Sequence, residues 1–137
     1  MVRCFIANYR KAIQINPNYP AALNSLGAVL ATQNNFDEAI VWFRKALEIA
    51  PDDASVHNNL GKALDEKGLF DEAVNHYEKA LRSDPQNPEI HFNLGRALAQ
   101  LGRTNDAIEQ FSGALRLQPD YAEARQQLRA LGVSVPE

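Results

Sequence analysis

The stretch Asn59-Leu60-Gly61-Lys62-Ala63-Leu64 decides the fold, because the chain repeats its pattern at a constant spacing. The same leucine–glycine pair occurs in residues 25–30 and 93–98, so that glycines recur every 34 residues, at Gly27, Gly61 and Gly95. A single globular core has no reason to repeat in sequence. A stack of similar units does, since each unit buries its apolar face against the next. The period therefore predicts a repeat architecture.

Further positions keep the same period and describe the unit as a pair of helices. Each glycine is followed by an alanine, an aromatic residue, a second alanine and a proline, which are Ala39, Phe43, Ala46 and Pro51 in the first unit; Ala73, Tyr77, Ala80 and Pro85 in the second; and Ala107, Phe111, Ala114 and Pro119 in the third. The apolar steps of three, four and seven are typical of helices. Asn34, Gly68 and Gly102 stand where a first helix ends and the chain needs a positive φ.

This combination of leucine–glycine pair, alanine, aromatic residue and terminal proline resembles the tetratricopeptide repeat. The resemblance covers Pro20 to Tyr121. It implies an all-α, right-handed superhelical solenoid of antiparallel helix pairs, with full repeats at 20–53, 54–87 and 88–121. The family's usual tryptophan in the first helix is replaced here by Leu23, His57 and His91.

The same frame extends to both ends of the chain and predicts one domain over residues 1–137. Phe5 and Tyr9 take the places of Ala39 and Phe43, so residues 3–19 are expected to form the second helix of a truncated repeat. Residues 122–131 are expected to form a polar capping helix. Residues 132–137 are left as a tail.

Bulk composition sets limits on partners and compartment. The 137 residues have a formal net charge of −3, with both signs intermixed, so neither nucleic acid nor an anionic membrane is the expected partner. No apolar run approaches the roughly 18 residues of a membrane span. The lone cysteine, Cys4, excludes a disulfide framework, and we expect a cytoplasmic protein.

Candidate catalytic and metal-binding residues are few. His57 and His91 share one repeat position and should lie about 10 Å apart, too far for two zinc ligands. His76 is expected on the surface. Cys4 has no base near it in the sequence, and there is no phosphate loop or metal-ligand spacing. We therefore expect no enzymatic activity, no cofactor and no metal.

The predicted concave face offers the best candidate for binding. In this fold it is lined by the first helices, and the side chains off their packing stripe are rich in asparagine, which offers one acceptor and two donors to an extended peptide. The predicted groove residues are Asn24, Asn58, Asn59, Lys62, Phe92, Asn93 and Arg96. Asn59 and Asn93 directly precede the leucine–glycine pair, as in the repeats of O-linked N-acetylglucosamine transferases. That resemblance implies an asparagine ladder that holds peptide main chain.

These patterns favour a scaffold that binds an extended peptide or a helix of another protein, of unknown identity. Self-assembly is the alternative, because the unpartnered first helix should expose an apolar strip of Phe5, Ile6, Tyr9 and Ile13 through which two chains dimerise. A third interpretation, a targeting arm of a larger enzyme or regulator, is compatible with both. Trp42 adjoins the core residue Phe43 and is a candidate contact on the outer face.

Overall fold

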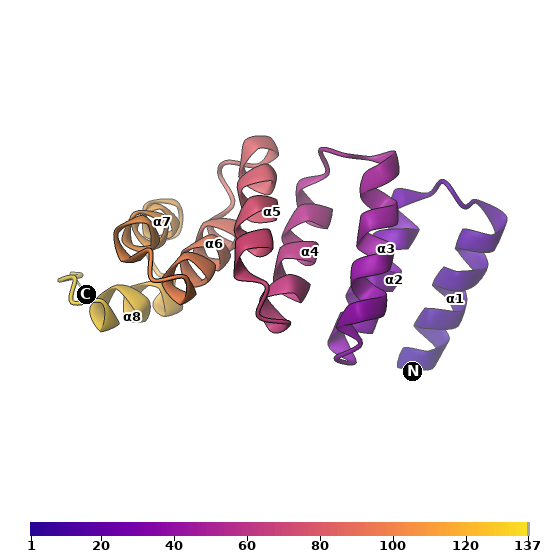
Figure 1. Ribbon diagram of the computed structural model, residues 1–137, viewed down its shortest axis with the longest axis horizontal. Coiled ribbons are helices and arrows are strands. Elements are labelled where there is room, and N and C mark those ends of the chain that lie inside the picture. Colours follow the sequence, from indigo (N-terminus) through magenta and orange to yellow (C-terminus); the bar gives the residue numbers. More distant parts are fainter. Residues whose placement is uncertain (137) are drawn as a thin grey trace.

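The computed structural model describes residues 1–136, which form eight α-helices and no strand. The helices are α1 (Val2–Ile15), α2 (Pro20–Thr32), α3 (Phe36–Ile49), α4 (Ala54–Glu66), α5 (Phe70–Ser83), α6 (Pro88–Gln100), α7 (Thr104–Leu117) and α8 (Ala122–Ala130). They follow one another along the long axis of the molecule, with the termini at opposite ends (Figure 1). The predicted all-α helical repeat fold is confirmed. Glu137, the last residue of the predicted tail, lies outside the described residues.

Each predicted repeat contains one helix pair, α2–α3, α4–α5 or α6–α7. Every helix packs on the next one in the chain, and the two helices of a pair share the closest contacts. The first helices α2, α4 and α6 also contact each other in succession, whereas the backbones of successive second helices make fewer contacts. The stack therefore curves toward the side of the first helices, and that side is concave.

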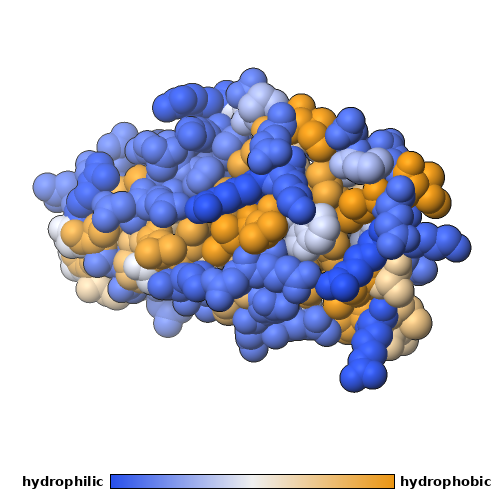
Figure 2. Space-filling view, turned by 45° about the vertical axis from the view of Figure 1, so that its right-hand side comes forward, coloured by the Kyte–Doolittle hydropathy of each residue, from blue (hydrophilic) through white to orange (hydrophobic). Residues whose placement is uncertain are grey.

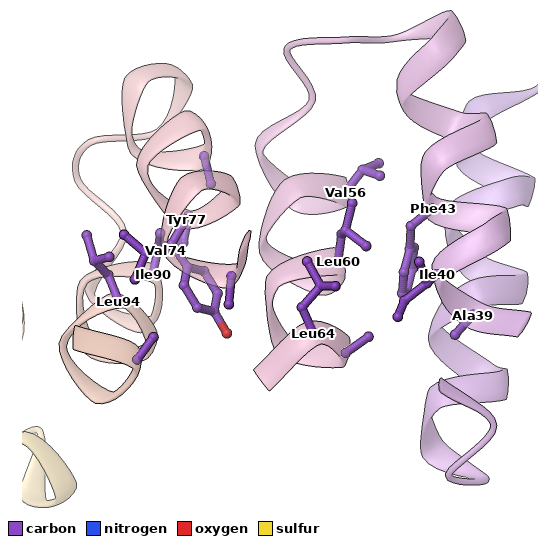
Figure 3. Close-up of a cluster of buried hydrophobic side chains, with 14 of the residues drawn as sticks. Ala39, Ile40, Phe43, Val56, Leu60, Leu64, Val74, Tyr77, Ile90 and Leu94 are labelled. Carbon is purple, nitrogen blue, oxygen red and sulfur yellow. The ribbon is translucent and has the colours of Figure 1, made fainter. Parts of the chain in front are cut away.

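The repeating glycines allow the two helices of a pair to approach closely. A Cβ atom added at Gly61 would lie 2.6 Å from Cε1 of Tyr77, which is closer than real Cβ contacts allow. Gly27 and Gly95 face Phe43 and Phe111 in the same way. The three rings are buried, and Figure 3 shows Phe43 of α3 pointing toward the leucines of α4. One glycine and one ring thus form the packing unit of each repeat.

The turn inside each repeat has the conformation that the sequence predicts. Gly68 and Gly102 have φ values of 74° and 75°, and Asn34 has a φ of 62°. Asparagine is one of the few residues other than glycine that enters this region readily. The three first helices consequently end in the same way.

Side chains cap two of the first helices. The Asp53 carboxylate accepts a hydrogen bond from the Val56 amide, and the Asn87 side chain accepts from the amides of Glu89 and Ile90. These oxygens satisfy amides that have no partner within the first turn. The prolines lie just beyond the second helices, which they prevent from continuing.

The two ends of the stack are covered differently. At the C-terminal end Ala124 and Leu128 of α8 are buried, and Val133 and Val135 of the tail pack against the core. At the N-terminal end α1 has no buried residue. Figure 2 shows one face of the molecule, where an apolar strip runs between borders of hydrophilic side chains.

Candidate functional site

Four asparagines on the first helices form hydrogen bonds from repeat to repeat. Asn59 Nδ2 donates to Asn24 Oδ1 at 3.0 Å, and Asn93 Nδ2 donates to Asn58 Oδ1 at 3.1 Å. The two bonds are equivalent, because they join the same positions one repeat apart. Asn24 Nδ2 also donates to the Ser55 hydroxyl at 3.3 Å. The amides therefore join the first helices to each other.

The structure differs here from the predicted open row of amides. Asn58 is only 8% exposed and Asn93 only 6% exposed, while Asn24 and Asn59 are half-buried. The sequence pattern places these residues on the groove side but cannot show that successive first helices contact each other. That contact covers the amides and gives them protein partners. Of the four, Asn59 is the one that lines an open cleft of the groove.

The polar row stops at the third repeat. Phe92 occupies the position of Asn24 and Asn58, and its ring lies 5.1 Å from that of Tyr121 and 5.6 Å from that of Phe111, centroid to centroid. The Arg96 guanidinium lies 5.9 Å from the Phe92 ring centroid. Aromatic contacts thus replace amide bonds where the last repeat meets the capping helix.

Lys62, the remaining predicted groove residue, is exposed and forms an ion pair. Its Nζ lies 3.4 Å from Glu89 Oε1 on the next first helix. The Asn58 amide lies 3.5 Å from the same oxygen. Glu89 therefore holds a cation and an amide of the preceding repeat.

Two clefts open on the first-helix side, one repeat apart. The first cleft has a volume of about 410 Å³ and is lined by Ala28, Ala31, Thr32, Asn34, Phe36, Phe43, Asn59, Lys62, Ala63 and Glu66. The second has a volume of about 220 Å³ and is lined by Asp65, Glu66, Phe70, Arg96, Ala97 and Gln100. Every residue of the second cleft lies 34 positions after a residue of the first. The two clefts are therefore the same structural feature with different side chains.

A carboxylate–phenol pair lies between the second cleft and the core. The Tyr77 hydroxyl donates to Asp65 Oδ2 at 2.6 Å, while Asp65 Oδ1 is buried without a hydrogen-bond partner. Burial raises the pKa of Asp65 above its usual 3.8, although the Tyr77 bond and nearby Arg96 act in the opposite direction. Burial and the Asp65 charge raise the pKa of Tyr77. At the positions of Asp65 and Tyr77, the first repeat has Ala31 and Phe43, and the third repeat has Ala99 and Phe111. The sequence signal for this pair is that both partners change together in the central repeat.

A histidine pair in the central repeat is a second feature that the sequence did not reveal. His57 Nδ1 and His76 Nδ1 lie 3.0 Å apart, and the ring centroids lie 5.3 Å apart. The centroids are farther apart than the nitrogens, so the rings meet edge to edge. His76 is therefore half-buried and paired with His57, rather than fully exposed. The repeat period aligns His57 with His91, whereas the observed contact joins His57 to His76 on the other helix of the same repeat.

The protonation of this pair follows from its partners. His57 Nε2 lies 2.7 Å from the Pro51 carbonyl oxygen, which only accepts, so this nitrogen carries hydrogen. Neutral His57 then accepts at Nδ1, and His76 donates from its own Nδ1. Burial lowers the pKa of His76 to about 4, and positive charge on Lys79 and Arg44, and on His57 when it is protonated, acts in the same direction. An added proton can be held at His76 Nε2 without breaking the contact.

The position of His57 ties the second repeat, the third repeat and α8 to the loop before each of them, whereas the first repeat has Leu23 there. His91 Nε2 lies 3.0 Å from the Pro85 carbonyl oxygen, and Arg125, at the same position in α8, donates to the Pro119 carbonyl oxygen at 2.7 Å. These carbonyls follow the ends of the second helices, where backbone acceptors have no helical donor. His57, His91 and Arg125 each supply that donor.

The predicted self-association residues are only partly exposed. Ile6, Tyr9 and Ile13 pack against the core through α2, and Phe5 remains 49% exposed. The apolar surface of α1 is thus smaller than the sequence predicts, because α2 covers one side of the helix. Its role in self-association remains a prediction.

Trp42 is half-buried and in contact with charged groups on its own helix. Its Nε1 lies 3.3 Å from Glu38 Oε1, and Lys45 Nζ lies 4.4 Å from the ring centroid. The predicted outer-face contact with a partner stays a prediction.

Cys4 is exposed. Among residues 1–136 no group of three or more candidate ligands is placed to hold a metal ion, and no helix is both long and apolar enough to cross a bilayer.

Comparisons with known proteins agree with this geometry. Two sequence models described as tetratricopeptide repeat match residues 18–86 and 58–122. A crystal structure of MamA superposes with a TM-score of 0.88 at 21% identity, covering 92% of this chain and 74% of that chain. A MamA fragment from Desulfovibrio magneticus RS-1 gives a TM-score of 0.87 at 20% identity, covering 93% and 72%. The TPR domain of Arabidopsis OM64 gives 0.80 at 22% identity, covering 82% and 93%. At these identities the likeness shows the fold. A search of curated protein sequences finds no significant match.

Proposed function

Because the chain belongs to the tetratricopeptide repeat family, we propose that it is a scaffold whose concave groove binds an extended segment of another protein. Repeats of this family are generally non-catalytic and bind protein partners along the curved surface of the stack. The pair of clefts on the first helices, one repeat apart, is the observation that carries the proposal. Two clefts one repeat apart suit a ligand that extends along the stack.

The asparagines have a narrower role in this proposal than in the transferase-like ladder. Asn58 and Asn93 hold the first helices in register, because their amides are buried and bonded to each other. Asn59 lines the first cleft, and its Oδ1 accepts no hydrogen bond from the described residues. We assign to Asn59 the contact with ligand main chain, as acceptor for a peptide N–H group.

A displayed library of random peptides tests the proposal. Selection on the wild-type chain should give binders whose capture is lost in Ala28→Arg, because the long cationic side chain occupies the first cleft. Glu109→Arg, an exposed site on α7, is the matched control and should retain binding. Circular dichroism verifies that both variants are folded. Full retention of binding by Ala28→Arg would contradict groove binding.

Self-association through α1 is the second candidate, favoured by the exposed ring of Phe5. A second copy would cover Phe5 and its neighbour Val2 about a two-fold axis. Light scattering after size-exclusion chromatography should then show a dimer that Phe5→Glu converts to a monomer. A monomeric wild-type chain at millimolar concentration would exclude this candidate.

A further inference from the structure

We propose that the groove selects a peptide in which an apolar side chain enters the first cleft and a basic side chain enters the second. This inference deepens the proposed function and rests on it. It follows from the difference between two clefts that occupy equivalent places in neighbouring repeats.

The first cleft is mainly apolar because two alanines line it at positions where the next repeat has larger polar side chains. Ala28 and Ala31 occupy the positions of Lys62 and Asp65 in the next repeat. Their methyl groups leave a space of about 410 Å³, bordered by the rings of Phe36 and Phe43. An aliphatic or aromatic side chain that enters this space leaves water and contacts carbon on several sides. A charged side chain would lose hydration among these apolar groups, and Glu66, which the first cleft shares with the second, is exposed and gives it no buried partner.

The second cleft carries an excess of negative charge. Two carboxylates, Asp65 and Glu66, face one guanidinium, that of Arg96. Glu66 lines both clefts and forms no ion pair with any described residue, whereas Glu89 is already held by Lys62. A lysine or arginine side chain of a ligand complements this charge.

Asp65 adds a buried acceptor to the second cleft. Its Oδ1 has no hydrogen-bond partner in the structure, and Tyr77 holds only the other oxygen. An unpaired buried acceptor is costly, so a ligand donor that reaches it gains more than one that meets water. Arg96 borders the same cleft, and its displacement toward the Phe92 ring would give a ligand cation access to Asp65.

The spacing of the clefts fixes the spacing of the two ligand side chains. Neighbouring first helices are in contact, and packed helices lie about 8–10 Å apart. A polyproline II segment has three residues per turn and rises about 3.1 Å per residue, so residues about three apart point the same way at about 9 Å. The inferred ligand is therefore an extended segment with an apolar residue and a basic residue about three positions apart.

Short fluorescent peptides of glycine, serine and proline test this inference directly. The probe carries one leucine with a lysine three positions away, in both chain directions, and its comparison peptides replace the lysine by glutamate or the leucine by serine. Fluorescence anisotropy should show the leucine–lysine probe binding about tenfold more tightly than either comparison peptide, a difference of about 1.4 kcal/mol.

Two variants assign each preference to its cleft. Ala31→Leu fills the first cleft and should remove the preference for leucine, whereas Ala99→Leu, at the same position in the third repeat, should keep it. Asp65→Asn removes a carboxylate that lines the second cleft alone and should reduce the preference for lysine, whereas Glu109→Gln, at an exposed site on α7, should not. Circular dichroism and urea unfolding establish that each variant keeps its fold.

The outcomes separate this inference from the proposed function. Equal binding of the lysine and glutamate probes, or tighter binding of the glutamate probe, overturns the inference, as does the absence of binding by all probes. In each case the proposed function stands as long as library-selected peptides still lose binding in Ala28→Arg. If that variant binds the selected peptides normally, the proposed function fails independently.

Discussion

The central repeat and its two neighbours have the same backbone but hold their helix pairs together differently. In the first and third repeats an alanine faces a phenylalanine at the base of the groove, as with Ala31 and Phe43. In the central repeat Asp65 and Tyr77 stand there and form a hydrogen bond. Both residues of this contact thus differ together between repeats, and the hydrogen-bonded Asp65–Tyr77 pair occupies the place of an alanine–phenylalanine pair.

The contrast extends to a second pair of positions. His57 and His76 meet in the central repeat, where the first repeat has Leu23 and Trp42 and the third has His91 and Gln110. In the third repeat His91 Nδ1 lies 2.9 Å from Gln110 Oε1. The central repeat therefore contains ionisable groups at two places where the first repeat is apolar, and its stability should depend on pH in a way that the first repeat's does not.

The largest effect is expected from adding a side chain at the closest approach of the two helices. Gly61→Ala places a Cβ 2.6 Å from the Tyr77 ring, and overpacking of this kind costs about 1–3 kcal/mol. The Asp65 bond restrains the Tyr77 ring, whereas no such bond holds Phe111. Gly61→Ala should therefore lose more unfolding free energy in urea than Gly95→Ala. An equal loss at both sites would show that the bond does not restrain the ring.

The second prediction converts the central repeat to the pattern of its neighbours. Asp65→Ala leaves the buried Tyr77 hydroxyl unpaired and should cost about 1–3 kcal/mol. Tyr77→Phe leaves a partly buried carboxylate without its donor and should cost a similar amount. The double variant restores the alanine–phenylalanine pair and should unfold within about 0.5 kcal/mol of wild type, since removing both partners is nearly neutral. Additive losses in this double-mutant cycle would exclude the coupling.

Whether a feature of the helix pairs could be predicted from the sequence depends on whether it is local or recurs in every repeat. The spacing of Gly61 and Tyr77 predicts the helix pair, and Gly68 predicts its turn, because these features are local or exactly periodic in every repeat. The Asp65–Tyr77 and His57–His76 bonds are deviations from the period, and their partners lie on different helices. Only the side-chain geometry shows that such deviations meet.

The groove was predicted less completely than the fold for a related reason. The first-helix positions of Asn58 and Asn93 follow from helical periodicity, but their burial depends on how closely α2, α4 and α6 approach each other. The clefts depend on the size of side chains from adjacent repeats. The residue pattern of one repeat gives neither the distance between successive first helices nor the space between side chains of adjacent repeats.

A third prediction concerns pH and the histidine pair. The pKa of His76 is lowered from 6.5 to about 4, so between these values the unfolded chain binds more protons than the folded chain. The His76 contribution to stability is therefore full above pH 6.5 and is lost as the pH falls toward 4. His76→Gln, which copies Gln110, should reduce this pH dependence by on the order of 1 kcal/mol after solvent screening.

Asp65 acts with the opposite sign and provides an internal comparison. Its raised pKa means that the folded chain binds more protons than the unfolded chain above pH 3.8, so its contribution is lost as the pH rises through the folded-state value. Urea unfolding of His76→Gln and Asp65→Asn across pH 3.5 to 8 should shift the stability profile in opposite directions. Shifts in the same direction would contradict this assignment of charge states.

The smallest expected effect concerns ion pairs between successive second helices. Arg10 pairs with Glu38 at 2.9 Å, and Arg44 pairs with Glu72 at 3.2 Å at the equivalent positions one repeat later. In the next repeat the acidic position is Asp106, but the arginine position is taken by Glu78. Glu78→Arg would extend the row to the third repeat and remove a like-charge neighbour. A gain of about 0.2–0.5 kcal/mol in unfolding free energy is expected, declining at high salt. A loss of stability would show that Arg103 already satisfies Asp106 more favourably.

The ties between the proline carbonyls and the following first helix bear on how this molecule tolerates changes of length. His57, His91 and Arg125 each reach back six residues to the carbonyl that ends the preceding repeat. Insertion or deletion of a whole repeat that carries such a donor keeps the same tie at the new junction, because the neighbouring repeat supplies the equivalent proline carbonyl. A shorter insertion in one of these loops separates them and leaves the rest of the array unchanged. Length variation in such a chain is therefore expected in whole units, and the groove grows or shrinks by one cleft at a time.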